Sequence, residues 1–181
     1  METLELIKDR VPDYAKDLRL NLDAVLNRSS LTPAQANGAA LAAAFAAKSA
    51  PLVAALRDGA LDPAQAQAAL TAAALMGMNN VWYPYVEMAA DPELKTVRPE
   101  LRMNAYATDG GVDRTSFELY GLAASIVGKC EFCVQSHYKL LREDGFSTQQ
   151  LRDVGRIAAV VNAVAQVLAA ERVEATETAA A

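Results

Sequence analysis

Hydrophobic positions recur along this chain with a helical period, and proline, glycine and short polar stretches divide them into segments. Several segments begin with a capping residue that is followed three positions later by Gln or Glu, as at Thr32, Asp62, Thr115 and Ser147. The pattern predicts helices over residues 2–9, 13–28, 33–47, 51–58, 63–88, 98–106, 116–127, 131–143 and 148–170. It predicts no strand.

Composition supports an all-α fold. The chain is 52% hydrophobic and 6% aromatic, and much of its apolar content is alanine, which favours helices and disfavours strands. A chain of 181 residues suits a single domain. We expect a single-domain helical bundle over residues 1–170 with a CxxC motif at 130–133. Residues 171–181 are small, polar and alanine-rich, and we expect this tail to fray.

Charge and hydropathy limit the partners and the location. The net charge is −5 and no basic patch is visible, so we expect no nucleic-acid binding. The N-terminus lacks a signal-peptide pattern. The longest apolar stretch, residues 39–47, is shorter than the about 20 residues of a membrane span. We therefore expect a cytoplasmic protein without membrane contact, in which a purely structural disulfide would not persist.

The two cysteines, Cys130 and Cys133, lie close to the single histidine, His137. On a helix these spacings place all three side chains on one face, and a helix N-terminus lowers the pKa of a thiol. The set fits a redox dithiol, but it also fits two buried cysteines or a three-ligand zinc site. A c-type haem is excluded, because Val134 occupies the position that requires histidine.

Helix geometry also suggests roles for the site residues. His137 is one turn after Cys133 and two turns after Cys130, so the imidazole reaches Cys133 more directly. We therefore expect Cys133 to be the nucleophile and Cys130 the resolving thiol. Glu118 is either a buried carboxylate that relays protons to this site or the last member of a capping box that begins at Thr115.

Residues 76–83 contain two adjacent amides and the single tryptophan. Buried amides need hydrogen-bond partners. Asn79, Asn80 and Trp82 are therefore expected either to serve packing and assembly or to line the site.

Glu118 followed by Cys130-x-x-Cys133-x-x-x-His137 resembles the signature of the alkyl hydroperoxide reductase D (AhpD) family, a branch of the carboxymuconolactone-decarboxylase-like superfamily. Residues 12–17, 76–81 and 101–104 also resemble AhpD sequences, so the resemblance covers nearly the whole chain. It implies an all-α homotrimer that reduces small organic hydroperoxides with no bound metal or flavin.

The resemblance also implies roles for individual residues. Cys133 forms the sulfenic acid, and Cys130 donates a proton and closes the disulfide. Glu118 and His137 form a proton relay. Phe132 stands where some family members carry histidine between the cysteines, so no role of that imidazole carries over.

The resemblance further implies that electrons come from dihydrolipoyl groups on a lipoylated 2-oxoacid dehydrogenase component, served by dihydrolipoamide dehydrogenase. They pass to the peroxiredoxin AhpC. Two alternatives stay open: a decarboxylase or isomerase on the same fold, which would not need the cysteines, and a structural bundle that binds zinc through two cysteines and a histidine.

Overall fold

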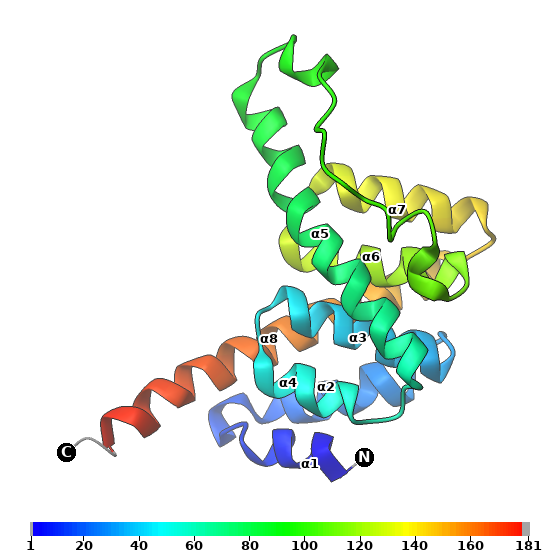
Figure 1. Cartoon of the computed structure of the whole chain (residues 1–181). Helices are drawn as coiled ribbons and strands as arrows, with labels where there is room; N and C mark the ends of the chain where they lie inside the picture. The colour runs from blue at the N-terminus through cyan, green and yellow to red at the C-terminus, as the bar shows by residue number, and fades with distance from the viewer. Residues whose placement is uncertain (1, 179–181) are drawn as a thin grey trace.

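Helices are the only regular elements among residues 2–178, the part of the chain that this computed structural model describes (Figure 1). The all-α prediction is confirmed. In chain order the elements are α1 (Glu2–Asp9), η1 (Asp13–Ala15), α2 (Lys16–Asn27), α3 (Pro33–Ala46), α4 (Ala50–Arg57), α5 (Pro63–Ala89), η2 (Leu94–Thr96), η3 (Asp109–Gly111), α6 (Arg114–Gly128), α7 (Glu131–Glu143) and α8 (Thr148–Thr178).

Side-chain caps fix where several helices begin. Before α3, the Gln35 backbone N–H donates to the Thr32 hydroxyl at 3.3 Å, and the Thr32 N–H donates to the Gln35 side chain at 3.1 Å. Ser147 and Gln150 make the same reciprocal pair before α8. Each cap satisfies backbone donors that a helix start leaves unpaired, which is why these sequence signals located the helices correctly.

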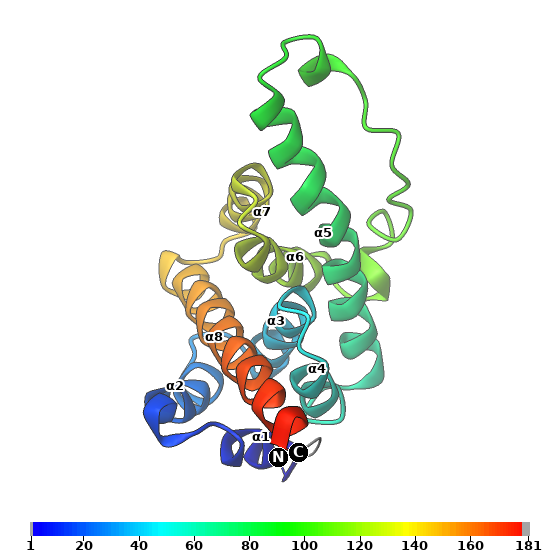
Figure 2. The same cartoon turned by 90° about the vertical axis from the view of Figure 1, so that its left-hand side faces the viewer.

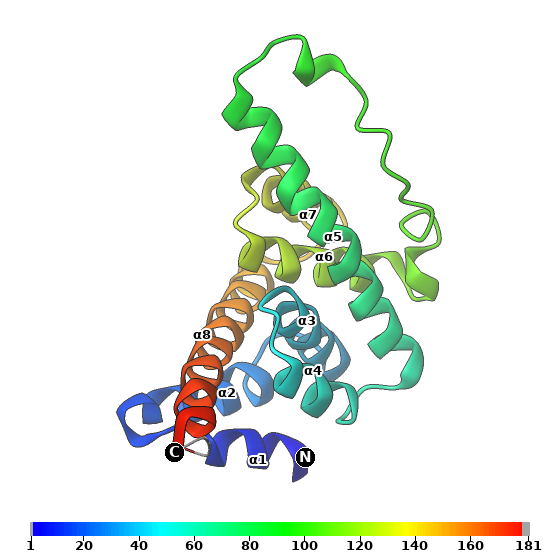
Figure 3. The ribbon, with the colours of Figure 1, turned by 60° about the vertical axis from the view of Figure 1, so that its left-hand side comes forward.

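The helix predicted over residues 98–106 is wrong. This segment is extended and then makes turns as it returns from the far end of α5 to α6 (Figures 2 and 3). Arg98 precedes Pro99, which disfavours helical backbone at residue 98. Glu100 then adopts a left-handed φ of 51°. The segment is also mostly exposed, so no buried face compensates for these conformations.

Helix α8 runs to Thr178, beyond the end expected near residue 170, and residues 179–181 lie outside the described part. Its portion Thr148–Glu171 is long and apolar enough to cross a membrane by composition. One face of this portion nevertheless packs in the protein core through Val154, Ile157, Val161 and Leu168. The same composition therefore also describes a buried core helix.

Helix α3 lies at the centre of the bundle and packs against α5, α6 and α8. Residues 39–44 are fully buried and, apart from Leu41, are all alanine, so neighbouring helices can approach α3 closely. The closest approach is at Gly38, where an added Cβ would overlap the ring of the buried Tyr120 on α6. The hydroxyl of Tyr120 donates to the side chain of Gln65 at the start of α5. This tyrosine therefore joins three helices.

The C-terminal half of α5 projects beyond the bundle, and residues 91–113 return from its tip toward α6 (Figures 1 and 3). Helix α7 lies beside the base of this projection. Val81, Tyr85 and Met88 are exposed on α5, at a spacing that places them on one helix face. We call these three residues the α5 stripe.

We predict that Gly38→Ala destabilises the protein by about 1–3 kcal/mol, because the methyl group forces Tyr120 out of its packed position. Gly155→Ala is the matched control, since Gly155 is also inside a helix but has no atom within 4 Å of an added Cβ. Alanine should stabilise there by about 0.5–1 kcal/mol. Urea unfolding of both variants measures this contrast, and equal stability of the two would contradict it.

Candidate active site

A tight junction between α6 and α7 sets the position of the cysteines. Helix α6 ends at Gly128, and Lys129 takes a left-handed φ of 56°. The Cys130 N–H then donates to the Ser125 carbonyl at 3.3 Å, which closes the end of α6. Cys130 itself caps the start of α7, with Cys133 in the first turn. The chain therefore reverses directly into the reactive segment, with no intervening loop.

Asn80 of α5 holds this junction from the side. Its amide nitrogen donates to the Ala124 carbonyl in the last turn of α6 at 3.2 Å. A Cβ at residue 128 would overlap the Asn80 amide, so Gly128 is required for close approach. Asn79 lies against the site itself, because its backbone carbonyl is 3.9 Å from Cys130 Sγ. Trp82 instead packs against Tyr85, with ring centroids 5.8 Å apart.

The sulfur atoms of Cys130 and Cys133 are bonded to each other in this structure. The Cys133 backbone N–H also points at Cys130 Sγ, at 3.2 Å. With the sulfurs joined, Cys130, Cys133 and His137 do not present a ligand set. Residues 2–178 hold no group of three or more His, Cys, Asp or Glu side chains placed to bind a metal ion.

The two cysteines differ in their access to solvent. Cys130 is completely buried, whereas Cys133 is 3% exposed and lines a cavity of about 190 Å³. The cavity is bounded by α5, the 91–113 segment and α7. Its lining residues are Met76, Asn79, Tyr83, Met103, Tyr106, Phe132, Cys133, Ser136 and His137. A small molecule in this cavity therefore meets Cys133 first, while Cys130 lies behind it.

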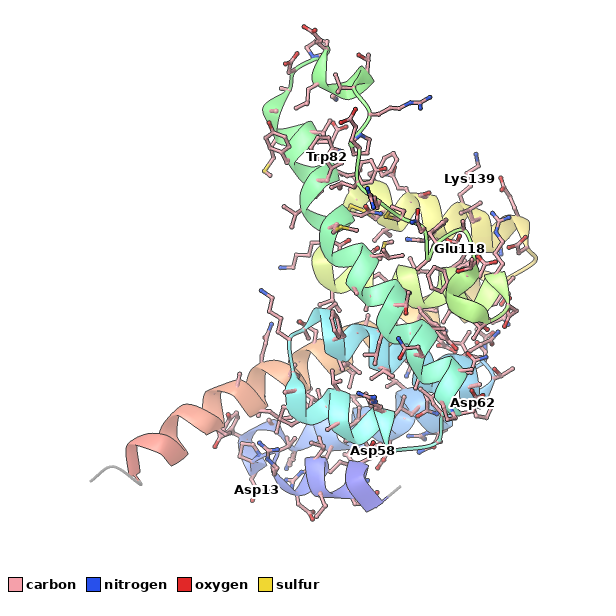
Figure 4. The ribbon with its side chains drawn as sticks, in the orientation of Figure 1. Asp13, Asp58, Asp62, Trp82, Glu118 and Lys139 are labelled. Carbon is pink, nitrogen blue, oxygen red and sulfur yellow. A yellow bond between two sulfur atoms is a disulfide. The ribbon has the colours of Figure 1, made fainter. Side chains whose placement is uncertain are left out.

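His137 is buried and uses both ring nitrogens. Nδ1 lies 2.6 Å from Glu118 Oε2 on α6, and Nε2 lies 3.1 Å from Met76 Sδ on α5. Glu118 lies where α6 faces α7 (Figure 4). Because an ionised carboxylate only accepts hydrogen bonds, we assign the Nδ1 proton from this contact. Gly121 leaves room for the ring, since a Cβ there would be 2.8 Å from His137 Cε1.

Other groups engage the ring nitrogens of His137. Helix spacing predicted that the imidazole would reach Cys133 more directly than Cys130. Within the described part of the chain, the ring nitrogens instead contact Glu118 and Met76, and they make no hydrogen bond to either sulfur. Helix spacing places the two side chains on one face but does not fix the direction in which the ring nitrogens point.

The neighbours of Glu118 determine the pKa of its carboxyl group. Burial on its own raises the pKa of this carboxyl. Hydrogen bonds from His137 and Tyr106, together with the charge of the imidazole ring, outweigh burial and hold the pKa below the ordinary 4.5. Burial, followed by the hydrogen bond to Glu118 and its charge, raises the pKa of Tyr106. Glu118 is therefore an anion held by two donors.

The capping interpretation of Glu118 is wrong. Asp113 caps α6, and its carboxylate accepts from the Ser116 N–H at 2.9 Å and from the Thr115 hydroxyl at 2.6 Å. The helix therefore begins two residues earlier than a Thr115 cap requires. Glu118 is therefore not in the capping position, and its side chain is 1% exposed.

Sequence reasoning missed two partners of the buried histidine and glutamate. Tyr106 lies in the segment that was expected to be helical, and no local pattern marked it. Met76 lies in the unusual 76–83 stretch, but that pattern did not indicate a thioether beside His137. The stacking of Tyr83 on Phe132 was also missed, because its two rings come from different helices.

We predict that Glu118→Gln destabilises the protein by about 1.5–3 kcal/mol near neutral pH, because the hydrogen bonds to a charged group are lost. The lowered pKa means that the native state binds fewer protons than the unfolded state. The contribution of Glu118 to the free energy of unfolding is therefore complete above pH 4.5 and declines as the pH falls toward the native pKa.

The stability difference between wild type and Glu118→Gln should accordingly narrow in acid, as measured by urea unfolding from about pH 6 to about pH 3. Glu143→Gln is the control, because Glu143 is exposed on α7. A stability difference between wild type and Glu118→Gln that stays constant with pH would contradict the lowered pKa of Glu118.

Comparison with known proteins agrees with this geometry. The family described as "Carboxymuconolactone decarboxylase family" matches residues 92–174. A Rhodospirillum centenum protein named "Alkyl hydroperoxide reductase AhpD" is 46% identical over 172 residues, which cover 93% of this chain and 92% of the relative. Proteins of the same name from Maricaulis maris and Coxiella burnetii are each 41% identical, over 93% and 91% of this chain and 99% and 96% of their own length. The chain therefore belongs to the AhpD family, within the carboxymuconolactone-decarboxylase-like superfamily.

Proposed function

We propose that this protein is a thiol peroxidase and disulfide reductase that reduces organic hydroperoxides through Cys130 and Cys133. One observation carries the proposal: Cys133 of a CxxC pair lines a small cavity directly beside the hydrogen-bonded network of His137, Glu118 and Tyr106. The names of the relatives support the same reaction class.

In the first step, the reduced Cys133 thiolate attacks the distal oxygen of the hydroperoxide. The O–O bond breaks, an S–O bond forms, and the alkoxide leaves as an alcohol after taking one proton. Cys130 then attacks the sulfenic acid sulfur, which releases water and forms the disulfide. Cys133 is assigned the first attack because it lines the cavity and Cys130 does not.

We assign the proton movements to the buried network. Glu118 accepts hydrogen bonds from His137 and Tyr106, so charge on the imidazole is stabilised when the ring is protonated. The disulfide form brings neither ring nitrogen to a sulfur. The relay to Cys133 therefore requires rotation of the imidazole or a water molecule in the cavity.

Reduction of the disulfide needs a dithiol that reaches Cys133 through the same cavity. We propose dihydrolipoyl groups on a lipoylated 2-oxoacid dehydrogenase component, kept reduced by dihydrolipoamide dehydrogenase. The protein then reduces either a hydroperoxide or the oxidised peroxiredoxin AhpC. The support is the family membership, and the proposed setting is the cytoplasm. No cofactor is proposed to stay bound.

The test is peroxide-dependent oxidation of NADH by dihydrolipoamide dehydrogenase and lipoamide, with and without this protein. Dihydrolipoamide dehydrogenase oxidises NADH only until the lipoamide is reduced, so we expect sustained NADH oxidation only when the protein and cumene hydroperoxide, or oxidised AhpC, are both present. Thiol alkylation should abolish it. A decarboxylase or isomerase on this fold would keep its activity after alkylation. The proposal would be overturned if adding this protein left the rate of NADH oxidation unchanged.

The cysteine roles predict different outcomes for two variants. Cys133→Ser should lose all peroxide-dependent modification. Cys130→Ser should accumulate a sulfenic acid at Cys133, because the resolving thiol is absent. Mass spectrometry after dimedone trapping measures both outcomes. Trapping at Cys130 in the Cys133→Ser protein at the wild-type rate would reverse the roles.

We also propose that the protein assembles as a homotrimer through the α5 stripe. Val81 and Met88 are 70% and 78% exposed, which is costly for a row of apolar groups on a projecting helix. A cavity of about 270 Å³, lined in part by Phe45, Gly77 and Val81, borders the stripe. The stripe of one copy docking in this cavity of the next would form a heterologous contact, which closes into a ring when the rotation between copies is one third of a turn.

Light scattering should give a mass about three times 19.3 kDa for the wild type. Val81→Glu should shift the mass toward 19.3 kDa, because it places a charge in the apolar contact. Leu20→Glu is the control, since Leu20 is an exposed apolar residue on α2, apart from the stripe. A monomeric wild type, or a trimer unaffected by Val81→Glu, would count against this assembly.

A further inference from the structure

Phe132 stands between the two cysteines, yet its side chain is 49% exposed. Its ring stacks on Tyr83 of α5, with centroids 4.1 Å apart and an angle of 23° between the ring planes. Both residues line the cavity that contains Cys133. We call them the aromatic pair. Each ring limits the motion of the other, so the pair is a preorganised apolar wall next to the reactive sulfur.

The remaining lining of the cavity restricts what it can hold. Its nine residues include no Lys, Arg, Asp or Glu. Apart from the reactive thiol, the lining side chain that can carry a charge is His137, and its Nδ1 is already paired with Glu118. Met76 and Met103 add apolar thioethers, which adapt to irregular shapes. The volume of about 190 Å³ is below the roughly 300–1,000 Å³ of pockets for drug-sized ligands. A small, uncharged, apolar group fits these limits better than a long acidic lipid chain.

We propose that the aromatic pair determines substrate specificity: it holds the aryl or branched alkyl group of a small uncharged hydroperoxide while the peroxide oxygens reach Cys133. This inference rests on the proposed peroxidase function and names the substrate class of that site. During the reaction the S–O bond forms to the distal oxygen and the O–O bond breaks. The organic group stays on the proximal oxygen and leaves as the alcohol, so its contact with the rings persists through bond cleavage.

The proposal predicts discrimination between organic hydroperoxides and hydrogen peroxide, which has no apolar group to place against the rings. Contact with one ring face removes on the order of 50 Å² of apolar surface from water, which corresponds to about tenfold in rate. The relevant quantity is the ratio of the second-order rate constants for cumene hydroperoxide and hydrogen peroxide. A ratio cancels effects that act on the thiol alone.

The experiment is stopped-flow oxidation of the pre-reduced full-length protein in a single turnover, which separates peroxide attack from re-reduction. Phe132→Ala should lower the ratio about tenfold. Phe132→Tyr should keep it near the wild-type value, because a tyrosine ring can stack in the same way. Tyr138→Ala is the matched control, since Tyr138 is an exposed aromatic residue on α7 that does not line the cavity.

Tyr83→Ala should lower the ratio in the same direction, and the double variant should lose less than the two single effects combined, because the rings act as one unit. Equal losses for both peroxides would mean that Phe132 only supports the helix start, which overturns the proposal. A raised ratio in Phe132→Ala would mean that the ring obstructs entry, which also overturns it. A wild type that reacts with neither peroxide would overturn the proposed peroxidase function itself, so the two failures are distinguishable.

Discussion

The hydrogen bond between His137 and Glu118 holds the reactive helix on the protein. Among the described residues of α7, only Cys133, His137 and Leu141 are buried, and they lie one turn apart on a single face. Cys133 and His137 therefore belong to the candidate site, and only Leu141 is an ordinary core residue. A hydrogen bond to a charged partner contributes about 1.5–3 kcal/mol, more than one between neutral groups. The residues that form the site are thus also the residues that attach α7 to the bundle.

The same carboxylate reaches a third part of the chain. Tyr106 belongs to the irregular segment that returns from the tip of α5, and its hydroxyl donates to Glu118. The residues of this segment are exposed or only partly buried, so Tyr106 is one of its main attachments to the bundle. Its ring also meets Phe117 edge-on, with centroids 5.8 Å apart. The wall of the cavity formed by this segment is therefore positioned by the group that anchors His137.

The sequence predicted local features correctly where they depend on one helix start or on one face of a single helix. The reciprocal caps at Thr32 and Ser147 located α3 and α8, and the spacing of Cys130 and Cys133 placed both at the start of α7. Glu118 shows where this reasoning stopped. Two capping residues, Asp113 and Thr115, compete within one turn, and only the packed structure shows which one begins α6.

Contacts between distant segments were not readable. The approach of Met76 to His137 joins residues 61 positions apart, and the stack of Tyr83 on Phe132 joins different helices. Neither contact has a signature in residue spacing, because both depend on how α5 crosses α7. The resemblance to a family supplied the proposed relay role of Glu118, whereas the local pattern alone favoured a capping role.

The contact between Asn80 and Gly128 couples the choice of residue at two positions. Any side chain at residue 128 collides with the Asn80 amide, and that amide also satisfies the last turn of α6. A larger residue at 128 therefore requires Asn80 to move or to be replaced by a smaller residue, and the hydrogen bond from its amide to the Ala124 carbonyl is then lost. The CxxC segment consequently cannot be grafted onto a different helix pair as a short sequence. Its inheritable unit includes a residue some fifty positions upstream.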